Sequence, residues 1–284
     1  MELFDQLDLT DLLKRALAED LGNGDLTTAA TVSPGAAGHA RIVVKEEPNL
    51  IFCGGVLLGR IFRLAGAAPR FTLLAREGQL LERGAHAAEL EGNLSGLLIG
   101  ERTALNFAQL MSGIATVTSR FVDAIAGTSA RIIDTRKTHP GLRAIEKYAV
   151  RVGGGFNHRF GLDGGVLIKE NHIVAAGSIR NALDRARVVA PHTIRVEIEC
   201  ETLGQVEEAL RFGADAILLD NMTLDEIRRA RAMASAPVLL EVSGGVTLTT
   251  VREIAETGVD LISVGAITHS ARAADLSMLV EASS

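Results

Sequence analysis

The chain has 284 residues, of which 47% are hydrophobic and 23% are charged, and its formal net charge is −6 at pH 7. This length and composition are typical of a globular protein with a sizeable core, either one large α/β barrel or two domains. The longest apolar runs, such as residues 214–219, are far shorter than the roughly 20 residues of a membrane helix, so no membrane partner is expected.

The N-terminal residues and the cysteines both favour a cytoplasmic protein. Residues 1–20 are acidic early and amphipathic, unlike the basic and then apolar order of a secretion signal. Cys53 and Cys200 lack metal-ligand spacing and have apolar neighbours, so we expect two buried free thiols in a reducing compartment.

The first third of the chain predicts a mixed domain. Residues 7–20 have helical apolar spacing, and the glycine-containing stretch 19–28 is typical of a turn. Short, partly alternating segments then predict an antiparallel sheet with a helix packed on it, near 39–47, 50–54, 55–64 (the helix), 71–77 and 86–92. From Leu94 two further helices are expected, separated near Ser112 and Gly113.

From Arg131 onwards short apolar strands alternate with helices. Such strands indicate a parallel sheet buried on both faces. The predicted strands end at Thr135, Lys169, Glu199, Asp220, Ser243 and Val264, and the predicted helices lie near 142–152, 178–189, 202–212, 223–234 and 247–257. Six such units without a dinucleotide-binding glycine motif after the first strand favour a barrel over an open sheet. A last helix is expected near 274–284, and it can pack back on the first domain.

Polar or small residues follow all six strands, and in a βα barrel these positions converge on the active-site face. The residues concerned are Arg136, Lys137, Lys169, Glu199, Asp220, Ser243, Gly244, Gly245, Gly265 and Ala266. Small residues after the last two strands let backbone N–H groups approach a phosphate. Because half of the face is cationic and half acidic, a phosphorylated sugar with Mg²⁺ matches both halves.

Residues 134–172 form a positive island in this acidic protein, with seven Lys or Arg against four acidic residues. Such an island favours a small anionic ligand over nucleic acid, which needs a wider basic face. Arginine binds carboxylates in bidentate fashion, so Arg136 and Arg159, with His158 nearby, are candidates for a carboxylate or phosphate site. His139 and His172 can equally be structural, and Arg102 by itself reads as a solvated helix charge.

The chain closely resembles the quinolinate phosphoribosyltransferase family, also called nicotinate-nucleotide pyrophosphorylase (carboxylating), nearly from end to end. The resemblance rests on EDLGNGDLTT, GERTALNFAQLMSGIAT, DTRKTHPGLRAIEKYAVRVGGGFNHRFGL, VLIKENHI, VEIECETL, ILLDNM, EVSGG and LISVGAITHSA. It implies phosphoribosyl transfer from phosphoribosyl pyrophosphate to quinolinate, with loss of pyrophosphate and CO₂. It also implies an N-terminal α/β sandwich, here assigned to 1–110, followed by an incomplete α/β barrel, assigned to 111–273.

The resemblance also implies roles for individual residues. The quinolinate and ribose site would comprise Arg102, Thr135, Arg136, Lys137, His158, Arg159, Lys169, Glu199 and Asp220, with Lys137, Lys169, Glu199 and Asp220 as the catalytic members. The 5′-phosphate loops would comprise Ser243, Gly244, Gly245, Val264, Gly265 and Ala266. Glu199 and Asp220 would lie near Mg²⁺, directly or indirectly. Arg102 would enter the neighbouring subunit's site, so a homodimer is the expected minimum and a hexamer is compatible with it.

Three other functions are compatible with parts of this pattern. The first is the activity of relatives associated with molybdenum transport, and the intact basic segments argue against it. The second is nicotinate or nicotinamide phosphoribosyl transfer without decarboxylation. The third is a non-catalytic barrel that binds a phosphorylated metabolite, which would predict damage to the acidic pair or the basic cluster. No Ser–His–Asp or Cys–His pattern supports covalent catalysis.

Overall fold

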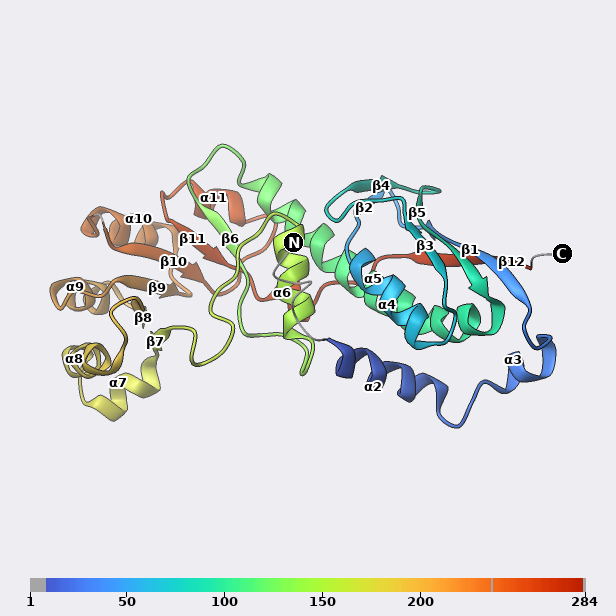
Figure 1. The fold of residues 1–284 in the computed structure, drawn as a ribbon. Coiled ribbons are helices and arrows are strands. Elements are labelled where there is room, and N and C mark those ends of the chain that lie inside the picture. The colour runs from blue at the N-terminus through green and yellow to red at the C-terminus, as the bar shows by residue number, and fades with distance from the viewer. Residues whose placement is uncertain (1–8, 236, 283–284) are drawn as a thin grey trace. The chain divides into compact units, whose positions relative to one another are not determined.

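The computed structural model describes residues 9–235 and 237–282, and the chain packs into two compact units (Figure 1). The first unit comprises the residues up to 117, residues 140–153 and the residues from 271 onwards. The second comprises 118–139 and 154–270. The predicted limits, 1–110 and 111–273, place residues 140–153 in the second domain, whereas packing places them in the first unit. The C-terminal segment belongs to the first unit, with which it was expected to pack.

A four-stranded antiparallel sheet forms the framework of the first unit, in the order β12-β1-β5-β3. Its strands are β1 (Ala37–Val44), β3 (Arg70–Leu73), β5 (His86–Asn93) and β12 (Leu276–Ala282). A separate antiparallel pair consists of β2 (Asn49–Ile51) and β4 (Leu80–Glu82). The antiparallel sheet predicted for the first domain is thus confirmed, although the segment near residue 50 pairs outside it.

The C-terminal segment completes this sheet as a strand, so the predicted C-terminal helix is wrong. Strand β12 pairs with β1 along its whole length, from Gly38 opposite Ala282 to Val44 opposite Leu276. Leu276 and Met278 are buried whereas Leu279 is 50% exposed, which is the two-residue alternation of a strand. A free edge of β1 was available to this segment, and that partner outweighed its local helical preference.

The helices of the first unit are α2 (Thr10–Leu21), α3 (Leu26–Thr31), α4 (Gly55–Leu64), the greater part of α5 (Leu94–Ala124) and α6 (Arg143–Val152). The predicted first helix is confirmed from Thr10, and its first two residues lie outside the described ranges. α3 begins inside the stretch predicted as a turn, where the Asp25 side chain accepts the Thr28 N–H.

α5 is one continuous helix of 31 residues, so the predicted division near Ser112 and Gly113 is wrong. Both residues serve packing instead. A Cβ at Gly113 would lie 2.0 Å from the carbonyl oxygen of Arg272, so only glycine allows this approach. The Ser112 hydroxyl accepts the N–H of Cys53 and donates to its carbonyl, both at 3.0 Å.

The second unit contains a six-stranded parallel sheet in the order β6-β11-β10-β9-β8-β7. Its strands are β6 (Arg131–Ile133), β7 (Val166–Ile168), β8 (Val196–Cys200), β9 (Ala216–Asp220), β10 (Leu239–Ser243) and β11 (Leu261–Ser263). All six predicted strands are confirmed. Because β6 and β7 stand at the two edges and do not pair, the sheet is an incomplete barrel, and Phe156 adds one parallel bridge beside β6.

Helices follow the strands of this sheet, and Figure 1 shows α8, α9 and α10 on one side of it. They are α7 (Glu170–Ala176), α8 (Ile179–Val189), α9 (Leu203–Arg211), α10 (Leu224–Met233), α11 (Val251–Ala255) and α12 (Ala266–His269). Thr202 and Thr223 begin α9 and α10 with capping boxes, three residues after Glu199 and Asp220. The chain therefore leaves each strand abruptly, which places these two carboxylates at the carboxyl ends of the strands.

Both cysteines are buried and free, as predicted. Burial raises the pKa of the Cys200 thiol to about 12, and the charge of Glu199 contributes in the same direction. Among the described residues, no helix is both long and apolar enough to cross a membrane.

Candidate active site

Lys169 and Glu199 meet at the carboxyl ends of β7 and β8. The Lys169 ammonium contacts Glu199 Oε2, and the lysine side chain is 47% exposed whereas the glutamate side chain is 14% exposed. The backbone N–H of Lys169 donates to His172 Nδ1 at 2.9 Å. His172 thus fixes the backbone at the start of α7, which gives it the structural role that the sequence left open.

Asp220 lies beside the first glycine loop. Asp220 and Ser243 are opposite each other in the parallel register of β9 and β10. Asn221 joins the two strand ends, because its backbone N–H donates to the Ser243 carbonyl at 3.0 Å and its side chain donates to Asp220 Oδ2 at 2.9 Å. Gly244 has φ +93°, and a Cβ there would lie 2.1 Å from Asn221 Oδ1, so this position requires glycine.

Lys137 lies beside the second glycine loop. Its backbone N–H donates to Thr135 Oγ1 at 3.0 Å, and its carbonyl accepts from Thr268 Oγ1 at 2.8 Å. Its side chain passes Gly265, where an added Cβ would lie 3.2 Å from Lys137 Cδ. The Val264 N–H donates to the Ile133 carbonyl at 3.0 Å, which aligns the ends of β11 and β6.

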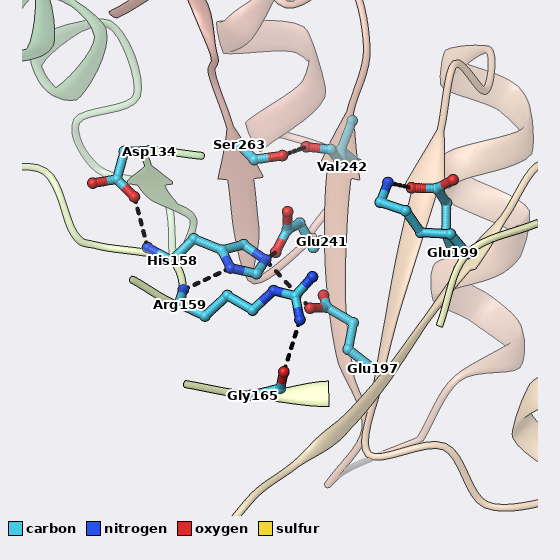
Figure 2. Close-up of polar contacts among 10 residues, drawn as sticks. Asp134, His158, Arg159, Gly165, Glu197, Glu199, Glu241, Val242 and Ser263 are labelled. Carbon is cyan, nitrogen blue, oxygen red and sulfur yellow. Dashed lines mark hydrogen bonds and ion pairs between the residues drawn. The ribbon is translucent and has the colours of Figure 1, made fainter. Parts of the chain in front are cut away.

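Arg159 is held from both ends of its side chain in the same unit. One Nη donates to the Gly165 carbonyl at 2.8 Å, and the backbone N–H donates to His158 Nδ1 at 2.7 Å (Figure 2). Burial lowers the pKa of Arg159, and the positive charge of Arg136 lowers it further, while Glu197 acts in the opposite direction. Two guanidinium groups that repel each other form a site where an anion is favoured.

A second acidic pair, which was not predicted, lies further back along the strands. Glu197 and Glu241 each stand two residues before a predicted site residue on the same strand, so they face the same side of the sheet. The His158 Nε2 atom lies 3.4 Å from Glu197 Oε2 and 3.8 Å from Glu241 Oε2 (Figure 2). These three residues line a cavity of about 470 Å³ together with Arg159 and residues from the amino ends of the strands.

Asp134, directly after β6, anchors the segment that carries His158. Its side chain is fully buried, and it accepts the His158 N–H at 2.8 Å and the Asn157 amide at 2.6 Å. Figure 2 shows Asp134 on the backbone side of His158, away from the ring nitrogens. The basic segment 157–159 is therefore tied to the end of β6 by an acidic residue within the positive island.

Arg102 is the predicted site residue that the second unit does not contain. It is exposed on α5, in the part of that helix that belongs to the first unit. The remaining predicted residues all belong to the second unit. They are Thr135, Arg136, Lys137, His158, Arg159, Lys169, Glu199, Asp220, Ser243, Gly244, Gly245, Val264, Gly265 and Ala266.

Comparison with known proteins gives one consistent result. Residues 25–112 match the family model of the quinolinate phosphoribosyl transferase N-terminal domain, and residues 114–279 match that of the C-terminal domain. The chain belongs to the quinolinate phosphoribosyltransferase family. It is 44% identical over 275 residues to a nicotinate-nucleotide pyrophosphorylase (carboxylating) of Mycobacterium leprae, covering 94% of this chain and 95% of that protein.

Further relatives extend the similarity to plants and to solved structures. A mitochondrial quinolinate phosphoribosyltransferase (decarboxylating) of Nicotiana tabacum is 38% identical over 293 residues, covering 96% of this chain and 82% of that protein. The structure of a nicotinate-nucleotide pyrophosphorylase from Francisella tularensis superposes with a TM-score of 0.90 at 39% identity, covering 96% of each chain. The predicted family, its decarboxylating phosphoribosyltransferase class and the α/β fold with an incomplete barrel are confirmed.

The sequence contained a signal for two of the three residues that were missed. Strand side chains alternate, so the pattern VEIEC places both of its glutamates on one face, and EVS does the same for Glu241 and Ser243. Asp134 gave no such signal, because an acidic residue at a strand end is unremarkable. Its role depends on the return of residues 157–158 to the end of β6.

Proposed function

We propose that this chain transfers the phosphoribosyl group of phosphoribosyl pyrophosphate to quinolinate in the cytoplasm, giving nicotinate mononucleotide, pyrophosphate and CO₂. The observation that carries the proposal is the family match over nearly the whole chain, with every predicted polar strand end present in one unit. This function would place the protein in the de novo synthesis of NAD.

The basic residues of the island are the proposed quinolinate site. Quinolinate carries two carboxylates on adjacent ring carbons, and Arg136 and Arg159 supply planar donor pairs for them. Lys169, with Thr135 and His158, would complete the site, and Lys137 would lie between quinolinate and the phosphoribosyl group. The Coulombic effect of Arg136 on Arg159 supports this arrangement, because an anion relieves the repulsion between the two cations.

The reaction needs orientation and electrostatics more than a protein nucleophile. The ring nitrogen attacks the anomeric carbon, the new N–C bond forms, and the C–O bond to pyrophosphate breaks. Glu199 and Asp220 would stabilise the positive charge that develops on the ribose. The cationic ring then accepts the electron pair of the breaking C2–carboxylate bond, CO₂ leaves, and C2 takes up a proton.

Mg²⁺ is the proposed cofactor, with Glu199 and Asp220 as its direct or indirect ligands. Carboxylate oxygens are the ligand type that Mg²⁺ prefers, and the two residues end neighbouring strands. One oxygen of each carboxylate bonds to Lys169 or to Asn221, which leaves the other for a cation or its water. Bound Mg²⁺ would supply charge stabilisation for the leaving pyrophosphate.

A homodimer is the proposed minimal enzyme, with a hexamer as a compatible larger assembly. Exposed Arg102 on α5 would serve the neighbouring subunit's site, and the glycine loops at 243–245 and 264–266 would bind the 5′-phosphate of the same molecule. Each active site would then contain residues from two chains.

The decisive test is CO₂ release from carboxyl-labelled quinolinate with phosphoribosyl pyrophosphate and Mg²⁺. We expect stoichiometric CO₂, pyrophosphate and nicotinate mononucleotide with quinolinate, no turnover with nicotinate, and loss of activity on metal chelation. Product formation from nicotinate alone would instead support the transferase that does not decarboxylate. Tight binding of phosphoribosyl pyrophosphate without turnover of either acid would support the binding-only barrel.

The proposed dimer can be tested by mixing two inactive variants, Arg102→Ala and Glu199→Gln. A mixed dimer would contain one intact site, so random exchange should restore about a quarter of wild-type activity. Absence of any recovery, with exchange confirmed by differently tagged chains, would show that Arg102 acts within its own subunit. Arg120→Ala, at an exposed arginine on the same helix, is the matched control for loss of charge.

A further inference from the structure

His158 is the centre of a buried group that joins three separate parts of the second unit. The His158 side chain is 14% exposed, that of Glu197 13% and that of Glu241 2%. The facing nitrogen and oxygen atoms of these residues all lie within 4.8 Å of one another. The histidine follows the bridge beside β6, whereas the two glutamates come from β8 and β10.

The hydrogen bonds around His158 define its tautomer. The Arg159 N–H donates to Nδ1 at 2.7 Å, so Nδ1 acts as an acceptor and carries no proton. Nε2 is then the protonated nitrogen, and it faces the carboxylates at 3.4 and 3.8 Å. The Nε2–H of this tautomer points toward both carboxylates, and Glu197 Oε2 is the nearer acceptor at 3.4 Å.

Two carboxylates that share one buried group cannot easily both be charged. Burial raises the pKa of Glu241 well above its ordinary value, and the negative charge of Glu197 raises it further. The hydroxyl of Ser263 and the charge of Lys169 oppose this shift more weakly. Among the described residues no hydrogen-bond donor reaches buried Glu241 Oε1, and the Ser263 hydroxyl donates to the Val242 carbonyl at 3.3 Å. An unpaired oxygen is costly for an ionised carboxylate and tolerable for a neutral acid.

We propose that Glu241 is a positioning residue, which keeps its proton, donates a hydrogen bond to the Glu197 carboxylate and so holds the His158–Arg159 segment in place to bind a substrate carboxylate. A metal ion in the same place is less favourable, because the positive charges of Arg159 and Lys169 act on these carboxylates. Glu197 and Glu241 together would then carry a single negative charge, which limits their repulsion of a dianionic substrate. The inference rests on the proposed role of Arg159 in carboxylate binding.

The kinetic test compares Glu241→Gln with Glu241→Ala and Glu197→Gln. Glutamine copies the shape and the donor of a neutral glutamic acid, so Glu241→Gln should keep kcat and the KM for quinolinate within about threefold of wild type. Glu241→Ala and Glu197→Gln should raise the KM for quinolinate about 10- to 100-fold, because each leaves a buried partner unsatisfied. The KM for phosphoribosyl pyrophosphate should stay nearly constant in all three.

The proposal depends on a difference in the KM for quinolinate between Glu241→Gln and Glu197→Gln. If Glu241→Gln is as impaired as Glu241→Ala, Glu241 works as an ion and the proposal is overturned. It is also overturned if Glu197→Gln is harmless or if both KM values rise together, which is the result expected of a purely structural role. Glu207→Gln, at an exposed position on α9, is the matched control.

A spectroscopic test addresses the buried group without any substrate. In ¹⁵N-histidine-labelled protein, His158 should show protonated Nε2 and unprotonated Nδ1 near pH 7, with its signal assigned by the variant His158→Asn. Glu241→Gln should preserve this pattern, and Glu197→Gln should change it. A doubly protonated His158 in the wild type would overturn the proposal. If the tautomer is as expected while no variant alters the KM for quinolinate, the positioning role is overturned, because the buried group then has no effect on the binding of the substrate carboxylate.

Discussion

Glu197 and Glu199 are two residues apart on strand β8, yet their carboxylates have opposite surroundings. Glu199 contacts the ammonium of Lys169, whose side chain is 47% exposed. Glu197 meets a histidine and a second glutamate, and the side chains of all three are at least 86% buried. Under the proposed function, the strand end would exchange Lys169 for substrate, whereas the interior group would fix the backbone behind it.

This difference predicts that substitutions at the strand end change chemistry, whereas substitutions in the interior change stability or binding geometry.

Glu199→Gln should lower kcat by about 100-fold or more, because it removes a charge that would stabilise the developing positive charge of the ribose. Its effect on the free energy of unfolding should be below about 1 kcal/mol, since the partner lysine is half exposed. Steady-state kinetics and urea unfolding measure the two effects. A large loss of stability with little loss of kcat would place Glu199 with the interior group.

Asp134→Ala should destabilise the protein by about 3 kcal/mol, because it removes two hydrogen bonds from a fully buried carboxylate and leaves their donors unsatisfied. Binding of quinolinate should weaken as well, since residues 157–159 lose their anchor to β6. Denaturant unfolding and quinolinate titration measure these changes. Full stability in Asp134→Ala would contradict the anchoring role, and Asp163→Ala, at an exposed position of the same island, is the control.

Glu241→Gln should alter the pH dependence of the free energy of unfolding, with a smaller effect than that of Asp134→Ala. A carboxyl group whose pKa is raised in the folded state keeps a proton that the unfolded chain releases, so wild-type stability falls as pH rises above about 4.5. The amide cannot ionise and lacks this decrease. The stability of Glu241→Gln relative to wild type should therefore increase with pH through neutrality, as measured by urea unfolding at several pH values. A difference that does not vary with pH would mean that the pKa of Glu241 is unaltered by folding.

The sequence by itself determined the features that repeat locally. Alternation of apolar strands with capped helices defined the six βα units, because strand burial and helix capping depend on neighbouring residues. It also located the polar strand ends such as Glu199 and Asp220, since parallel strands bring their carboxyl ends to one face.

Only the tertiary structure decided the contacts between distant segments. Residues 276–282 form a strand on the edge of β1, and Gly113 lies within α5, where the Arg272 carbonyl approaches too closely for any Cβ. The approach of His158 to Glu197 and Glu241 likewise required the curvature of the sheet and the return of the chain to β6. Local sequence specifies which face a side chain occupies, whereas its partner across the core depends on how the whole sheet closes.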